Sequence, residues 1–227
     1  MKSRIAGTGL VLALLAASGN PAFAETTAAS PAVAAPVAKP PLVPDDFKVP
    51  VLAEGPGFKL VPLGPALVKV DFDAYMSSIE HLQQTFSRST AWPREGITDA
   101  DAMKDMEGEQ ARFQARKSFA YGVLTPDGRR ERGSVYVRPS PSKDYDAVVS
   151  LWVTKADYDA GFDAELYRWV TGWVQKEWPF KRVAYPGRGI DWGTWDALVA
   201  ANGAKRPFGN APFGASRHRP APPPGHP

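Results

Sequence analysis

The chain has 227 residues, contains no cysteine and carries a formal net charge of +3 with a pI of about 9.1. The lack of cysteine excludes disulfides, thiol catalysis and a lipid anchor on an N-terminal cysteine. The basic balance does not indicate nucleic-acid binding, because residues 58–204 contain nearly equal numbers of acidic and basic side chains and the excess lies at the two ends.

The first 24 residues predict a secretory signal peptide. Lys2 and Arg4 precede a short apolar run at residues 9–17, and Ala22-Phe23-Ala24 places small residues at the two positions that signal peptidase reads. The apolar run is too short to cross a bilayer as a helix, which needs about 20 residues. We therefore expect export to the periplasm or the medium with cleavage after Ala24; an uncleaved N-terminal anchor is the alternative.

Composition divides the rest of the chain into three parts. Residues 25–57 are dominated by Ala, Pro, Val and Thr, which predicts an extended linker. Residues 205–227 form a basic, Pro-rich segment, for which we expect a disordered tail. The length of residues 58–204 fits one folded domain.

Within this domain, residues 58–63 and 66–70 indicate an opening strand broken at Pro62 and Gly64-Pro65. Asp71 is a candidate N-cap for a first helix through residue 86, and Thr98 with Asp101 resembles a capping box that opens a second helix to about residue 117. Two further strands are expected at 119–124 and 133–138. Pro126-Asp127-Gly128 predicts the hairpin turn between them.

The most informative stretch runs from residue 144 to residue 188. An apolar run at 147–153 predicts a strand buried on both faces, and the apolar residues between 162 and 174 recur with helical spacing. Pro179 ends that helix, and residues 180–185 predict a strand parallel to 147–153 through a right-handed crossover. A last helix is expected at 192–202. The order β-α-α-β-β-β-α-β predicts a single α/β (α+β) domain with a mixed central sheet and helices on both faces.

This order, together with several short motifs, resembles the GNAT acyltransferase superfamily and in particular a branch of uncharacterised GNAT-like proteins. The resemblance covers nearly the whole domain and neither the linker nor the tail. The segments that carry it are Phe58-Lys-Leu-Val-Pro-Leu63, Ser77-Ser-Ile-Glu-His-Leu82, Trp92-Pro93, Tyr136-Val-Arg-Pro139, Asp146-Ala147, Trp152-Val153, Trp178-Pro-Phe180 and Tyr185-Pro-Gly-Arg188.

The resemblance implies that the strands at 147–153 and 181–185 splay apart and that acetyl-coenzyme A enters the gap. Its pyrophosphate would lie on backbone N–H groups of the loop and helix start after the first of these strands. The cofactor-binding residues implied in this way are Val153, Lys155, Tyr158, Ala160 and Gly161.

The chain departs from the superfamily pattern in that loop. Lys155, Tyr158 and Ala160 stand at the motif positions, so Tyr158 replaces the first glycine, and Asp157, Asp159 and Asp163 add negative charge. The terminal strand pair of the superfamily has no clear counterpart. These departures and the export signal favour a non-catalytic or divergent module that binds a small ligand or an envelope protein; the alternative is an N-acyltransferase that uses acetyl-coenzyme A or another acyl-coenzyme A.

Alternation along the strands provides a second set of candidate ligand-binding residues. Their polar groups would lie on a sheet covered by helices, where they need partners or a ligand. Asp146 is the candidate catalytic residue, which would orient or deprotonate an amine, although an ion pair between Arg138 and Asp146 is the simpler interpretation. The candidates for ligand binding are Tyr136, Arg138, Ser150, Trp152, Tyr185 and Arg188.

Other chemistries find less support in the sequence. Of the three histidines, His81 is best interpreted as a solvated helix residue, and His218 and His226 lie in the tail. No pair of them has metal-ligand spacing within a folded segment, so no metal site is expected. The sequence indicates no oligomeric state.

Overall fold

The computed structural model describes residues 41–202 of the chain. The predicted signal peptide, residues 25–40 of the predicted linker and the predicted tail lie outside the described residues. None of the helices within residues 41–202 is long and apolar enough to cross a membrane.

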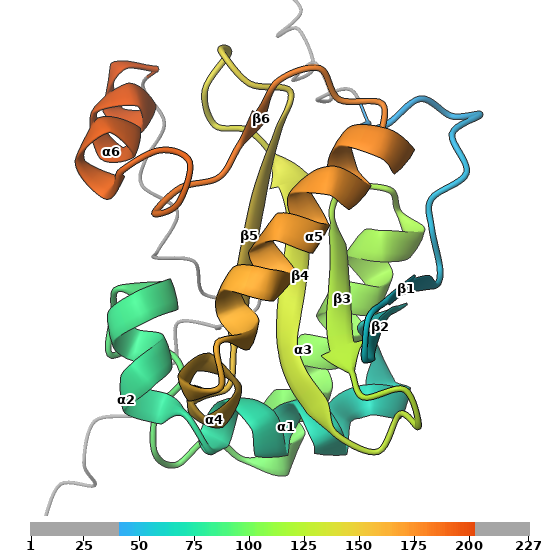
Figure 1. Cartoon of the computed structure of the whole chain (residues 1–227), viewed down its shortest axis with the longest axis vertical. Helices are drawn as coiled ribbons and strands as arrows, with labels where there is room; N and C mark the ends of the chain where they lie inside the picture. Colours follow the sequence, from blue (N-terminus) through green and yellow to red (C-terminus); the bar gives the residue numbers. More distant parts are fainter. Residues whose placement is uncertain (1–40, 203–227) are drawn as a thin grey trace, which may run out of the picture. The chain divides into compact units, whose positions relative to one another are not determined.

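A mixed six-stranded sheet, with the strands in sequence order, forms the centre of the domain (Figure 1). The pairs β1–β2, β2–β3, β3–β4 and β4–β5 are antiparallel, and the β5–β6 pair is parallel. The predicted mixed sheet is therefore confirmed. The strands are β1 (Ala53–Gly55), β2 (Phe58–Pro62), β3 (Phe119–Leu124), β4 (Glu131–Pro139), β5 (Ala147–Val153) and β6 (Val183–Ala184).

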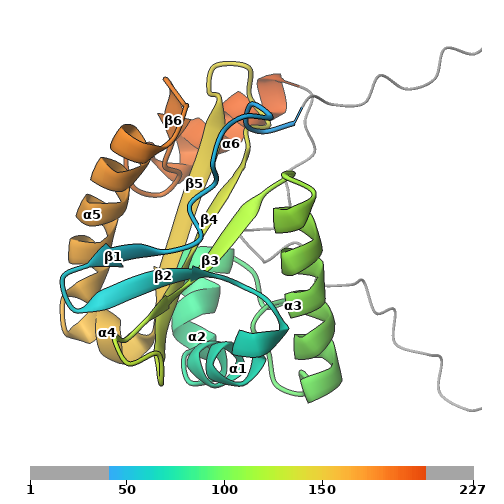
Figure 2. The same cartoon turned by 90° about the vertical axis from the view of Figure 1, so that its right-hand side faces the viewer.

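Helices cover both faces of the sheet, as Figure 2 shows. One face packs on α5, and the residues between them form the larger core. The other face packs on α1 and α3, and α2 contributes Leu82 to the core there. The helices are η1 (Pro65–Leu67), α1 (Val68–Met76), α2 (Ile79–Leu82), η2 (Gln83–Ser87), α3 (Asp99–Gln114), α4 (Lys155–Asp159), α5 (Phe162–Glu177) and α6 (Trp192–Ala201).

Helix α5 forms where the sequence places its apolar stripe. Phe162, Leu166, Val170 and Val174 recur every four residues, and all four are buried against the sheet. The helix ends at Glu177, two residues before Pro179, as a proline without an N–H requires. Strand β5 opposite is buried along almost its whole length, so the predicted strand and helix at the centre of the fold are both confirmed.

Two local signals in the middle of the chain are also confirmed. The hydroxyl of Thr98 accepts a hydrogen bond from the Asp101 N–H, and the Asp101 carboxylate accepts one from the Thr98 N–H, so the capping box is complete. The turn at residues 126–128 joins β3 to β4, with Gly128 at a φ of 75°.

The first helical region differs from the prediction. Residues 66–70 are helical rather than a strand, because η1 and α1 begin directly after Gly64. Asp71 is not an N-cap: it lies inside α1 and is buried. The single helix expected through residue 86 is divided at Ser77-Ser78, and its last turn, η2, is a π-helix. Apolar spacing alone does not reveal such breaks, since each segment keeps its inward residues.

The boundary of the predicted linker is also corrected. From residue 41 onward this segment belongs to the fold, because Val43 is 1% exposed and Phe47 packs on Trp178 with ring centroids 5.5 Å apart. β1 then pairs with β2, and the Tyr121 hydroxyl donates a hydrogen bond to the Pro50 carbonyl. Proline-rich composition obscured a segment whose few apolar side chains complete the core.

The end of the domain is simpler than the superfamily pattern. β6 has two residues instead of the six expected, whereas the predicted final helix is confirmed as α6. No strand follows α6 within residues 41–202.

Candidate functional site

Strands β5 and β6 are paired only at their first residues. The parallel register joins Ala147 to Val183 and Val148 to Ala184 and then stops, although β5 continues to Val153. The next residue of the second strand that would donate to β5 is Pro186, which has no backbone N–H. The two strands therefore separate at this point, and the remaining edge of β5 faces no strand.

The separation leaves backbone groups of β5 without a strand partner on that side. The Thr154 N–H donates to the Arg132 carbonyl, so the even-numbered residues of β5 bond to β4 and the odd-numbered ones face the β6 side. The N–H and C=O of Leu151 accordingly point into the gap. Such an edge can pair with an extended ligand that carries amide groups.

A cleft of about 270 Å³ fills the gap. One wall is the end of β5, another is the turn of α2 and η2, and the rest comes from Tyr158, the start of α5 and the turn between β6 and α6. The lining side chains of most interest are His81, Gln84, Thr85, Ser150, Trp152, Val153, Tyr158, Asp163, Arg188 and Trp192.

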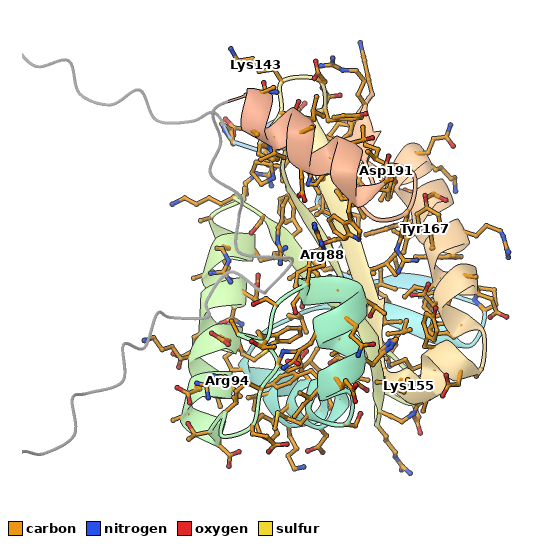
Figure 3. All side chains as sticks on the ribbon, turned by 90° about the vertical axis from the view of Figure 1, so that its left-hand side faces the viewer. Arg88, Arg94, Lys143, Lys155, Tyr167 and Asp191 are labelled. Atoms are coloured by element: carbon orange, nitrogen blue, oxygen red, sulfur yellow. The ribbon has the colours of Figure 1, made fainter. Side chains whose placement is uncertain are left out.

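The wall opposite β5 is held in place by Arg88, which directly follows the π-helical turn. Its guanidinium donates two hydrogen bonds to the Asp196 carboxylate, at 3.3 and 3.0 Å, and lies 4.4 Å above the Trp192 ring. Asp196 and Trp192 belong to α6, so Arg88 joins the α2–η2 wall to the α6 wall. Figure 3 shows Arg88 between these two elements.

His81 is the basic group of the cleft. Its ring lies against Tyr158, with centroids 4.8 Å apart, and next to the Val153 carbonyl at the end of β5. Partial burial, helped by the nearby charge of Lys155, lowers the pKa of His81 below its usual value. The imidazole is therefore mainly neutral at pH 7, and a neutral imidazole has one nitrogen that can accept a proton.

The fold is GNAT-like. Its element order and its parallel, separating β5–β6 pair are those that the sequence resemblance implied.

The chain is structurally similar to a ribosomal-protein-S5-alanine acetyltransferase from Vibrio fischeri, with a TM-score of 0.46, 14% identity, and coverage of 67% of this chain and 81% of that chain. It is also similar to a protein from Bordetella pertussis assigned to the GnaT family of acetyltransferases, with a TM-score of 0.44, 16% identity, and coverage of 59% and 77%. No family model matches the chain, and no curated protein matches it significantly.

The loop after β5 folds around a buried carboxylate, Asp157. This carboxylate accepts hydrogen bonds from Arg130 at 2.6 Å, from Arg132 at 2.7 Å and from the Thr154 hydroxyl at 2.7 Å. Burial by itself would raise the pKa of Asp157, but these hydrogen bonds outweigh it and hold the pKa below its usual value. Asp157 thus joins the β3–β4 hairpin to α4.

The other two aspartates of this region are paired as well. Asp159 pairs with Lys155 on the exposed face of α4. The carboxylate of Asp163 accepts two hydrogen bonds from the Arg188 guanidinium, each 2.8 Å long. The expectation that these three aspartates present negative charge to a ligand is therefore corrected, because each carboxylate has a cationic partner.

Several of the predicted site residues meet at the cleft. Ser150, Trp152, Val153, Tyr158 and Arg188 all line it. The predicted cofactor residues Lys155, Ala160 and Gly161 do not: Ala160 ends α4, and Gly161, with a φ of 82°, precedes α5. The left-handed glycine of this connection thus stands three residues after the position at which the sequence alignment expected one.

The other predicted residues lie away from the cleft. Asp146 is exposed at the opposite end of β5, where it pairs with Arg182 at 3.2 Å rather than with Arg138. Arg138 lies over the Tyr136 ring at 4.3 Å, and the Tyr136 hydroxyl accepts a hydrogen bond from the Trp152 indole at 3.2 Å. Tyr185 packs edge to face on Tyr167 with centroids 5.7 Å apart. The geometry thus gives Asp146 a structural role.

The prediction from sequence underrated His81 and did not include Gln84, Thr85 and Trp192. The available signal was the proline at 186 after the short strand, which implied that the two strands separate near His81. The π-helical turn that directs Gln84 and Thr85 at the cleft carries no sequence signal that we can identify. Such turns occur often at functional sites.

A second cluster of ionisable groups lies beneath α1. Asp71 and Glu131 are both buried and share a side-chain hydrogen bond, which requires a proton on one of them. Burial raises the pKa of Asp71 to about 7 and the pKa of Glu131 well above its usual value. Burial also raises the pKa of the neighbouring Asp105 to about 6. This cluster borders a space of only about 10 Å³, too small for an organic ligand.

Coenzyme A, which the resemblance implies, fits the site in part. The cleft and the free edge at Leu151 suit an extended arm with amide groups, whereas the loop at residues 154–161 offers little to a pyrophosphate. Its cationic neighbours are already paired with carboxylates. The nucleotide portion of coenzyme A therefore does not fit this loop as it does in the superfamily pattern.

Proposed function

We propose that the cleft between β5 and β6 binds a small acyl donor and that the chain transfers its acyl group to an amine. The observation that carries this proposal is the separation of the two strands over a 270 Å³ cleft edged by the backbone of Leu151. A cleft of that volume lies near the lower end of the range for small-molecule sites, about 300–1,000 Å³.

The ionisable groups of the cleft favour proton acceptance from an amine. Asp163 and Arg188 neutralise each other, whereas His81 is neutral and packs against the Tyr158 ring. In the reaction the amine nitrogen bonds to the acyl carbon, the carbon–sulfur bond of a thioester breaks, and the amine proton passes to His81 and then to the departing sulfur.

A second candidate is the non-catalytic module that the sequence favoured, which would bind the same class of ligand without turnover. It is favoured by the pairing of Asp163 with Arg188, which engages both of these charged groups of the cleft. We also propose, from the predicted signal peptide alone, that the protein acts outside the cytoplasm. Acyl transfer to any of a panel of primary amines that is lost in His81→Gln would decide for the first candidate.

The proposed site is tested by blocking it. Thr85 is exposed and lines the cleft, so Thr85→Trp should place an indole inside it and weaken binding of S-acetyl-pantetheine at least about tenfold, since filling the cleft removes most contacts. Isothermal titration calorimetry measures the dissociation constant. Thr90→Trp, at an exposed threonine outside the cleft, is the matched control. Equal affinity of Thr85→Trp and the wild type would contradict the proposed site.

A further inference from the structure

The backbone N–H groups of the loop after β5 are largely occupied within the protein. The Lys155 N–H donates to the Ser78 hydroxyl at 2.9 Å, and the Asp157 N–H donates to the Thr154 hydroxyl at 3.2 Å. Other donors of this loop bond to carbonyls at 2.8–3.2 Å; they are the N–H groups of Tyr158, Ala160 and Gly161. A diphosphate bound here would have to break these hydrogen bonds. Each broken bond would leave a hydroxyl or carbonyl acceptor that needs a new hydrogen-bond donor.

The cations near the loop are likewise engaged. Arg130 and Arg132 hold Asp157 in a part-buried contact, and Arg188 holds Asp163 through both of its terminal nitrogens. The first turn of α5 also contains the carboxylates of Asp163 and Glu165. At the positive end of the helix dipole, where a phosphate would otherwise be stabilised, Asp163 already holds the cation Arg188.

The side chain of Tyr158 adds bulk at the same place. Its ring rests on His81 and forms part of the cleft wall, between the edge of β5 and the start of α5. By contrast, nothing in the register of the sheet occupies the backbone edge at Leu151. The site therefore favours the arm of a thioester and disfavours a nucleotide attached to it.

Resting on the proposed function, we infer that the donor is an acyl thioester on a pantetheine-type arm that lacks the adenosine diphosphate portion of coenzyme A. The occupied loop and the Arg188–Asp163 contact offer the diphosphate no binding group, while the cleft accepts the acyl group and the amides of the arm. This chain thus differs in donor specificity from a protein that binds both the pantetheine arm and the nucleotide of coenzyme A.

The experiment compares ligands in calorimetric titrations of the full chain. S-acetyl-pantetheine and acetyl-coenzyme A should bind with dissociation constants within about threefold of each other, because the diphosphate gains nothing. Adenosine 5′-diphosphate alone should not bind. If acetyl-coenzyme A binds more than about tenfold more tightly than S-acetyl-pantetheine, the inference is overturned and the proposed function stands. One charge-assisted hydrogen bond to the diphosphate would suffice to produce this difference. Binding of neither thioester overturns both.

A substitution tests the physical cause. Asp163→Asn removes a carboxylate from the start of α5 and releases Arg188, so acetyl-coenzyme A should gain at least about tenfold in affinity relative to S-acetyl-pantetheine. Glu165→Gln removes a carboxylate from the same turn at an exposed position and is the matched control. Circular dichroism confirms that each variant is folded. An unchanged ratio in a folded Asp163→Asn variant would overturn the role assigned to the Arg188–Asp163 contact.

Discussion

Asp157→Asn is expected to lower the free energy of unfolding by about 3 kcal/mol at pH 7, because it leaves two arginines facing a neutral amide. The carboxylate of Asp157 is 5% exposed and Arg132 is 17% exposed, so most of this contact is shielded from water. Arg130 is 55% exposed, which places the expected loss at the lower end of the range for a broken buried ion pair, about 3–5 kcal/mol.

The pH dependence of this loss follows from the lowered pKa of Asp157. The stabilisation is present above the ordinary aspartate pKa, about 3.9, and disappears as the pH falls further, so the difference between variant and wild type should shrink in acid. Urea unfolding at pH 7 and pH 3.5 measures both effects. Asp159→Asn, which breaks only the exposed pair with Lys155, should cost at most about 0.5 kcal/mol. A similar small loss for Asp157→Asn would contradict the structural role of this residue.

Glu131→Gln is expected to weaken the dependence of stability on pH. The pKa values of Glu131 and Asp71 are both raised by burial, so each group stabilises the fold fully below its ordinary pKa and loses this contribution as the pH rises. For Asp71 the loss should be complete above about pH 7. For each proton that the chain takes up on folding, the free energy of unfolding falls by about 1.4 kcal/mol per unit rise in pH.

The glutamine can replace the protonated glutamate, because its amide donates to Asp71 and its carbonyl accepts the hydrogen bond that the Ser134 hydroxyl gives to Glu131 at 2.8 Å. Between pH 5 and pH 7 the wild type should therefore lose more stability than the variant, by up to about 1.4 kcal/mol per pH unit. Denaturant unfolding at four pH values measures the slopes. Glu107→Gln, on the exposed face of α3, should keep the slope of the wild type. Equal slopes for Glu131→Gln would show that no proton is bound at this pair.

The centre of the fold was predictable because its signals are local and strong. The apolar run at 147–153 predicts a buried strand, and the four-residue spacing from Phe162 to Val174 predicts a helix. The proline at 179 sets where that helix ends. The capping box at Thr98 and the turn at Gly128 are equally local. The resemblance to GNAT proteins then supplied the order in which these elements pair.

The first helical region and the linker were mispredicted for a common reason. Asp71 looks like an N-cap in the sequence, but a carboxyl group that shares a proton with Glu131 can be buried inside a helix. Val43 and Phe47 look isolated among prolines, yet they cover the edge of the core beside Trp178. Both outcomes depend on partners 60 residues or more away, which periodicity does not reveal.

The site was only partly predictable for a similar reason. The strand that carries Ser150 and Trp152 was identified, whereas the pairing of Asp163 with Arg188 and of Asp157 with two arginines depends on the tertiary structure. Counting charges along the loop therefore gave the wrong electrostatics. His81 was set aside because a lone histidine on a helix is usually solvated, and only the separation of β5 from β6 places it at a cleft.

The most direct test of the ligand site is a backbone amide NMR titration of the chain with S-acetyl-pantetheine. If the ligand pairs with the free edge of β5, the amide resonances of Leu151 and Val153 should shift and their hydrogen exchange should slow, while those of β2 and β3 remain unchanged. Shifts confined to other strands, or none at Leu151 under conditions in which calorimetry shows binding, would contradict the assignment of the cleft as the ligand site.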